Sequence, residues 1–176
     1  MSTGEFLTRV TIWMALAGYA LAATAGLLAG QRAQWQRRAR WAWTIGCAAF
    51  VAHVFCAFNY YYHWSHRAAY RETARQTAEV FGLDWGGGVF VGYAFTIAWV
   101  TDVVWWWFGR ESRRQRPRYL VIAWHAFFIF IIFNGTVVFE TGLIRWLGLG
   151  LCSALILLLW RQARRGEIPH TRLQKS

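Results

Sequence analysis

Residues 51–66 read Val-Ala-His-Val-Phe-Cys-Ala-Phe-Asn-Tyr-Tyr-Tyr-His-Trp-Ser-His. In this stretch an apolar segment, which begins at Trp41 and runs to about Tyr62, gives way to a polar one. The apolar part is long enough to cross a bilayer, because about 20 helical residues that rise roughly 1.5 Å each span its hydrocarbon core. The stretch therefore predicts a membrane-spanning helix whose end carries a cluster of histidine and tyrosine side chains.

The composition of the whole chain agrees with a membrane protein. Of 176 residues, 57% are apolar, 19% aromatic and only 15% charged, and the charges are bunched between long uncharged runs. The formal net charge of +11 comes from arginine clusters that flank apolar runs, where membrane topology accounts for them, so we expect no nucleic-acid partner. The cysteines lie inside apolar segments and imply no disulfide framework; they are Cys47, Cys56 and Cys152.

Five apolar runs are each long enough to span a bilayer. The sequence therefore predicts an all-α integral membrane protein with five transmembrane helices in a single membrane domain over residues 1–176. The predicted spans are residues 10–30, 41–62, 88–109, 119–139 and 142–160.

Arginine clusters follow the first, third and fifth runs, at residues 32–40, 110–118 and 161–172. Because cytoplasmic loops are enriched in basic residues, one orientation satisfies all three clusters, with the N-terminus outside and the C-terminus in the cytoplasm of a bacterial inner membrane. The alternative is a cleaved signal peptide ending at Ala23-Thr24-Ala25. Cleavage would place the first cluster on the wrong side, and the N-terminal segment lacks the positive start of such a signal.

Two stripes of spaced residues predict helix contacts. Gly18, Ala22, Gly26 and Gly30 recur every four positions on the first span, which is typical of a seam where a neighbouring backbone approaches closely. On the second span, Gly46, His53 and Tyr60 are seven residues apart and share one face.

An amphipathic helix is predicted on the external side over residues 66–82. Tyr70, Thr77 and Phe81 fall at helical spacing, and arginines take the other side. Two arrangements remain open. The helix either continues the second span out of the membrane, or it follows a bend near Asn59 or Ser65 and lies along the interface.

Ionisable residues inside the spans are the candidates for chemistry, since burying them in hydrocarbon is costly. Asp102 and His125 are each seven residues from the predicted cytoplasmic end of their spans, and His53 lies about 9 Å further out by the helical rise. One hypothesis is a b-type haem with His53 and His125 as axial ligands and Asp102 bonded to one of them. The depth difference between His53 and His125 opposes this hypothesis, because both imidazoles would have to reach one iron. The alternative is a histidine that only bonds a carbonyl or Asp102 within packed helices.

The spacing of His53 and His63 resembles one feature of a known family. The five-helix di-haem cytochrome b subunits of respiratory nitrate reductases also have an external N-terminus and two histidines ten residues apart on the second helix. The resemblance covers topology and this one spacing. In that family the partner ligands lie on the fifth helix, whereas the fifth span here contains no histidine, so the family's haems are not carried over.

The outer histidines suggest a second site. If the helix continues past Tyr62, His63 and His66 lie on one side at i,i+3, a spacing that can bind zinc or copper. Two ligands are too few, and Asp84 and Glu140 are the nearby carboxylates that the topology supplies. The alternative is an interfacial belt with polar tips in water.

No motif of a known catalytic class occurs, so we expect no catalytic activity of the chain's own. The sequence favours an accessory or anchor subunit that packs in lipid against other membrane subunits, or against copies of itself, in a redox or respiratory assembly. A haem protein using His53, His125 and Asp102, and a transporter or metal handler using His63 and His66, are the alternatives.

Overall fold

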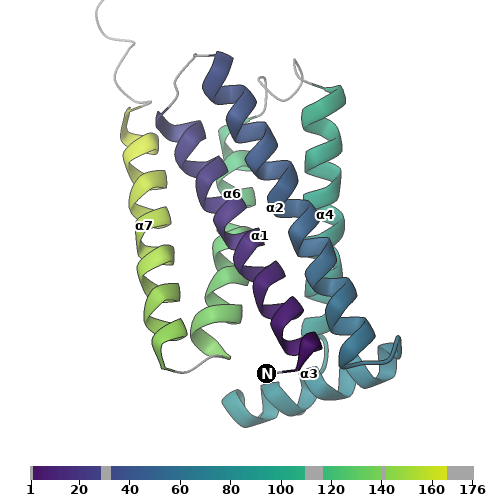
Figure 1. Ribbon diagram of the computed structural model, residues 1–176. Coiled ribbons are helices and arrows are strands. Elements are labelled where there is room, and N and C mark those ends of the chain that lie inside the picture. Colours follow the sequence, from purple (N-terminus) through teal and green to yellow (C-terminus); the bar gives the residue numbers. More distant parts are fainter. Residues whose placement is uncertain (1, 29–32, 110–116, 140–141, 166–176) are drawn as a thin grey trace, which may run out of the picture. The chain divides into compact units, whose positions relative to one another are not determined.

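The computed structural model describes residues 2–28, 33–109, 117–139 and 142–165, and every regular element in these ranges is helical (Figure 1). The elements in chain order are α1 (Thr3–Leu28), α2 (Ala33–Tyr60), α3 (His66–Phe81), α4 (Gly88–Phe108), α6 (Arg118–Phe133), the π-helical turn η1 (Asn134–Val138) and α7 (Leu143–Arg165).

Four of the described helices are long and apolar enough to cross a membrane, over Thr3–Ala25, Ala33–Tyr60, Gly88–Phe108 and Tyr119–Val138. The chain is therefore a multi-pass membrane protein with an all-α fold. The predicted fifth span corresponds to α7, whose described apolar part, Leu143–Leu158, is shorter than the other four. A fifth span and the orientation of the chain remain predictions.

The described residues form two compact units. The first contains α1 as far as Gly26 together with α2, α3 and α4, and the second contains α6, η1 and α7.

Helices α1 and α2 run antiparallel along the stripe that the sequence predicts. A Cβ built on Gly18 would lie 2.6 Å from the Cα of Gly46, and one built on Gly4 would lie 2.7 Å from the ring of Tyr60. Between these contacts, His53 reaches the backbone of α1 at Thr8. Gly46, His53 and Tyr60 therefore form the face of α2 that packs on α1. The seam on α1 is confirmed at Gly18, and Ala22, one turn further along, is also buried, while Gly30 lies outside the described residues.

Helix α4 packs antiparallel to α2 through aromatic rings. The ring centroids of Phe50 and Phe95 are 4.9 Å apart, and those of Trp43 and Trp99 are 5.4 Å apart. In the last turn of α4, the Trp107 indole donates a hydrogen bond of 3.1 Å to the Thr44 hydroxyl of α2. Aromatic rings bury much apolar surface, so they hold these helices together while glycine allows α1 to approach closely.

The chain bends between α2 and α3, so α3 does not continue the second span. His63 and Trp64 have positive φ angles of 46° and 59°, and Ser65 caps α3 by accepting a hydrogen bond from the Ala68 amide. At the other end Gly82 adopts φ +70°, which favours glycine. The predicted helix at 66–82 is thus confirmed as a separate element, and its external position stays a prediction.

In the second unit, α6 passes into η1 before the turn to α7. A Cβ built on Gly148 of α7 would collide with the side chain of Thr136 of η1, so this side chain packs directly against the backbone of α7. The Thr136 hydroxyl donates to the Ile132 carbonyl over 2.7 Å, and Arg145 donates to the Val137 carbonyl over 2.9 Å. These bonds satisfy main-chain carbonyls that the π-helical turn displaces from the regular hydrogen-bonding pattern of an α-helix.

Candidate functional site

His53 is held by the backbone of a neighbouring helix. Its Nδ1 lies 2.9 Å from the Thr8 carbonyl oxygen, which is an acceptor, so Nδ1 carries the proton and donates. In the neutral ring Nε2 is then the atom with a free lone pair. The Phe50 ring lies beside the imidazole with a centroid distance of 6.0 Å, and the side chain is half-buried.

This arrangement is the one expected for a histidine that bonds a carbonyl within packed helices. It is also the arrangement in which a histidine is oriented toward a metal, because metal-binding imidazoles commonly donate their other nitrogen to a carbonyl or carboxylate. The geometry of His53 is therefore compatible with both hypotheses drawn from the sequence.

Asp102 lies on the inward face of α4. It is 1% exposed and shares that face with Phe95 and Trp99, which are also buried. Its carboxylate is within electrostatic reach of the Cys47 thiol on α2. A carboxylate at this position is removed from water and from lipid alike, which makes Asp102 the most deeply buried acid among the described residues.

His53 and Asp102 occupy different levels of the first unit. Trp99 of α4 packs against Trp43 and Phe50 of α2. Because the two helices are antiparallel, Asp102 lies beyond Trp99 toward one end of the unit, and His53 lies beyond Phe50 toward the other end. A single group that contacts both side chains would have to bridge these two levels, and a site that His53 and Asp102 share stays a prediction.

His125, the third predicted cofactor residue, is half-buried on α6 and belongs to the second unit. Its pairing with Asp102, and a haem between His53 and His125, stay predictions.

The outer histidines do not share a helical face. His63 lies in the bend with φ 46°, and His66 is the first residue of α3. The i,i+3 geometry that motivated a metal site required a continuous helix, and that premise is wrong. His66 is instead engaged with Tyr93 of α4, with Nδ1 and the phenol oxygen 2.9 Å apart. Among the described residues no group of three or more His, Cys, Asp or Glu side chains is arranged to hold a metal.

Three partners of these residues were not predicted: Thr8 for His53, Tyr93 for His66 and Thr44 for Trp107. The Thr8 contact uses a backbone carbonyl, which leaves no signal in the sequence. Tyr93 is within reach of His66 only because of the bend before α3. The sequence offered one signal for this pair: Tyr93 lies in the first turns of the third span, at the same depth as the predicted interfacial belt that contains His66.

Comparison of the chain with protein-family models, with curated proteins and with solved structures found no match.

Proposed function

We propose that this protein is an accessory or anchor subunit of a redox or respiratory assembly in a bacterial inner membrane. In this proposal the chain has five spans, with its N-terminus outside and its C-terminus in the cytoplasm. The observation that supports a packing role is the use of interior polar groups to join helices. His53 joins α2 to α1 by a hydrogen bond, and Trp107 joins α4 to α2 in the same way.

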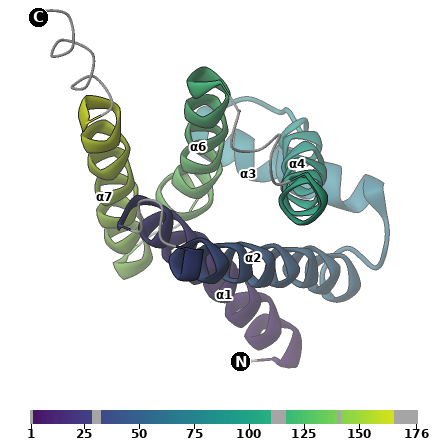
Figure 2. The same cartoon turned by 90° about the horizontal axis from the view of Figure 1, so that it is seen from above.

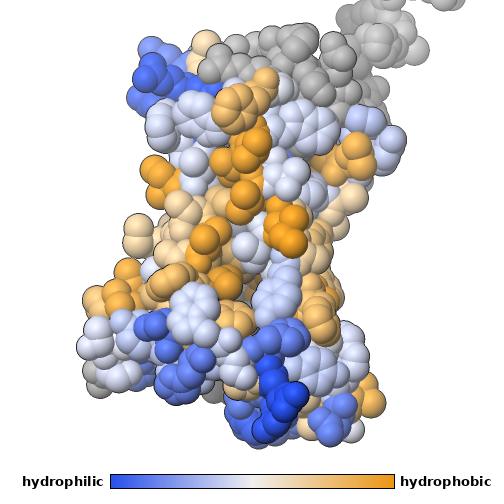
Figure 3. Space-filling model, turned by 90° about the vertical axis from the view of Figure 1, so that its right-hand side faces the viewer, coloured by the Kyte–Doolittle hydropathy of each residue, from blue (hydrophilic) through white to orange (hydrophobic). Residues whose placement is uncertain are grey.

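The outer faces of the same helices are apolar. Large exposed side chains follow one another along each of them, and Figure 3 shows an apolar band between two hydrophilic ends on the face that is turned to the viewer. Examples are Leu21 on α1, Phe55 on α2 and Ile97 on α4. Such faces bind lipid, and in an assembly part of them binds other membrane-spanning subunits.

The test is native isolation. A chain tagged at its C-terminus is expressed from its own promoter, extracted in mild detergent and analysed by native electrophoresis and mass spectrometry. A subunit migrates with other integral membrane proteins in fixed proportion, and the assembly carries redox absorbance that the separately expressed chain lacks. Migration as a monomer or as copies of itself alone would overturn the proposal.

Orientation is tested separately with reporter fusions. Alkaline phosphatase is active only outside the cytoplasm, whereas green fluorescent protein fluoresces mainly inside it. A phosphatase fused after Leu83 is expected to be active, and a fluorescent protein fused after Ser176 is expected to be bright. The reverse pair of results would invert the topology, and this result is independent of whether the chain is a subunit.

One observation favours a second candidate function, binding of a b-type haem. The Nδ1 bond to Thr8 leaves Nε2 of His53 as the atom that would bind iron. His125 is the predicted second ligand. Purified protein would then show a Soret band that His53→Ala and His125→Ala abolish and that His63→Ala, in the exposed bend, preserves. Colourless protein from haem-supplied cells contradicts this function.

A further inference from the structure

Helix α3 lies across the end of the first unit where α2 ends and α4 begins (Figure 1). In the view from above it is seen beyond α4, crosswise to the axis of that helix (Figure 2). A bend fixes this direction, since the chain leaves α2 through the positive φ angles of His63 and Trp64 before Ser65 starts α3. The hydrogen bond between His66 and Tyr93 then holds the first turn of α3 to α4.

The two sides of α3 differ in chemistry. Exposed charged side chains follow one another at steps of four residues along one side, namely Arg67, Arg71, Arg75 and Glu79. On the opposite side Ala69 and Thr77 are buried against the rest of the unit. The helix therefore presents its charges away from the spans and its small, uncharged residues toward them.

At its C-terminal end, α3 and the turn that follows carry four large apolar side chains that stay about half exposed. Val80, Phe81, Leu83 and Trp85 are 45%, 56%, 63% and 56% exposed. We refer to these four residues as the apolar foot. They are close together in the chain and surround Gly82, whose left-handed conformation turns the backbone there.

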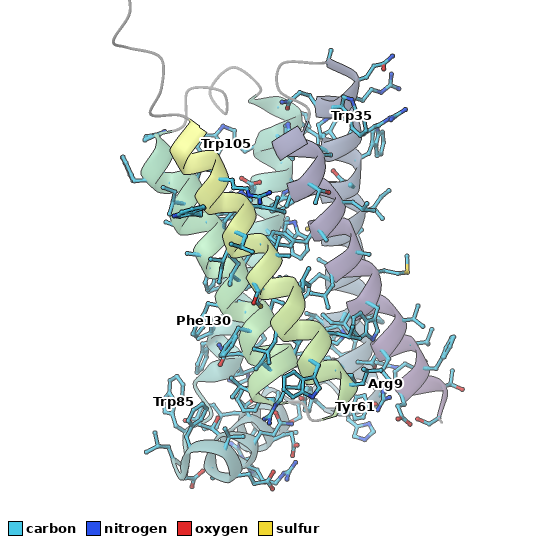
Figure 4. The ribbon with its side chains drawn as sticks, turned by 90° about the vertical axis from the view of Figure 1, so that its left-hand side faces the viewer. Arg9, Trp35, Tyr61, Trp85, Trp105 and Phe130 are labelled. Carbon is cyan, nitrogen blue, oxygen red and sulfur yellow. The ribbon has the colours of Figure 1, made fainter. Side chains whose placement is uncertain are left out.

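The depth of the apolar foot follows from the aromatic residues of the spans. Figure 4 places Tyr61 and Trp85 toward one end of the first unit and Trp35 and Trp105 toward the other. Along α2, the 19 steps from Trp41 to Tyr60 rise about 28 Å, close to the thickness of a hydrocarbon core of roughly 30 Å. Tyrosine and tryptophan at both ends of such a length are typical of the two membrane–water boundaries. The aromatic residues therefore predict a boundary at the end of the unit where Trp85 and the apolar foot lie.

We propose that α3 is an interfacial helix and that the apolar foot inserts into the boundary between lipid headgroups and acyl chains. The occupant of this surface is phospholipid, and the surface is continuous with the lipid-facing sides of the spans. Insertion is driven by burial of apolar area. Arg75 is bonded to both Glu72 and Glu79, so the outward side of α3 carries little excess charge, and zwitterionic lipid suffices.

Site-directed spin labelling in nanodiscs tests this inference. In a background of Cys47→Ala, Cys56→Ala and Cys152→Ala, a nitroxide is attached at Leu83→Cys or Phe81→Cys, with Arg71→Cys on the charged side as the matched control. The discs contain phosphatidylcholine alone or with phosphatidylglycerol. Power saturation compares collisions with oxygen, which concentrates in the membrane, and with a polar nickel chelate, which stays in water.

At positions 83 and 81 we expect oxygen collisions to exceed nickel collisions several-fold in both lipids, and the opposite ratio at position 71. Equal nickel accessibility at positions 71 and 83 overturns the proposal, since the apolar foot would then be in water. Low accessibility to both reagents at position 83 also overturns it, because protein would cover the surface. Spin–spin broadening at that position identifies a second copy as the cover. Insertion only with phosphatidylglycerol shows attraction by charge and refutes the apolar mechanism.

Discussion

The Cα of Gly46 lies 2.6 Å from the position that a Cβ would take on Gly18. The two glycines mark the point where α1 and α2 cross, and each backbone there occupies the space that a side chain would otherwise fill. Toward the C-terminal end of α2, His53 and Tyr60 also contact α1, and Gly46, His53 and Tyr60 are spaced seven residues apart. The contact between α1 and α2 is therefore set by residue size at one end and by a hydrogen bond further along.

Gly18→Ala is expected to destabilise the protein. The added methyl group would meet helix backbone, which cannot move away as a side chain can, and overpacking of this kind costs about 1–3 kcal/mol. The apparent Tm in detergent should fall by several degrees. The control is Gly92→Ala on α4, where a built Cβ has nothing within 4 Å. That change should be neutral or stabilising by up to about 1 kcal/mol, since alanine favours helix. Equal effects of the two substitutions would contradict the crossing.

Much of this helical framework could be predicted from the sequence. Uncharged runs predict the spans because a bilayer demands a minimum apolar length, and stripes such as Gly46, His53 and Tyr60 predict a contact face because side chains repeat every seven residues on a helix. Helix ends were less accurate. Helix α2 begins at Ala33 rather than near Trp41, since hydrogen bonding continues through the arginine-rich segment beyond the apolar run.

The contacts at the candidate sites were harder to predict. The bend before α3 depends on positive φ angles at His63 and Trp64, which are uncommon for residues other than glycine, so sequence alone left the helix direction open. That bend separates His63 from His66 and brings Tyr93 to His66. A long-range partner that depends on a turn becomes visible only once the turn is known.

Trp107 and Thr44 should show a measurable coupling energy. In a double-mutant cycle with Trp107→Phe and Thr44→Val, the hydrogen bond between them is removed in both single variants. Side-chain hydrogen bonds between membrane helices contribute about 0.6 kcal/mol on average and up to about 1.7 kcal/mol. We expect a coupling in this range from unfolding in mixed micelles. Thr96→Val is the control for the threonine change, because its hydroxyl bonds the Gly92 carbonyl of its own helix. A coupling of Thr96 to Trp107 as large as that of Thr44 would refute the specific pairing.

Ser65 should determine how stably α3 begins. Its hydroxyl oxygen accepts a hydrogen bond of 3.2 Å from the Ala68 amide, so Ser65→Ala removes the cap and is expected to cost about 1 kcal/mol of local stability. Hydrogen exchange should accelerate in the first turns of α3 while α4 stays protected. Ser65→Asp retains an acceptor at the cap and should restore the protection. If alanine and aspartate behave alike, the cap is not what starts the helix.

Glu72 should make the order of α3 depend on pH. The hydrogen bond from Arg75 is the main cause that lowers the pKa of this carboxyl below its ordinary value. A lowered pKa in the folded state means that the ionised carboxylate stabilises the helix. The contribution is fully present above the unfolded pKa of about 4.3 and is lost as pH falls through the lower folded value. A nitroxide at Arg71→Cys should therefore keep its mobility from pH 7 to about 5 and become more mobile below about 4. Glu72→Gln should be more mobile already at pH 7 and change less on acidification. If Glu72→Gln retains the full pH response, that response belongs to another carboxylate. Glu79→Gln, which removes the second bond to Arg75, then tests whether Glu79 is that carboxylate.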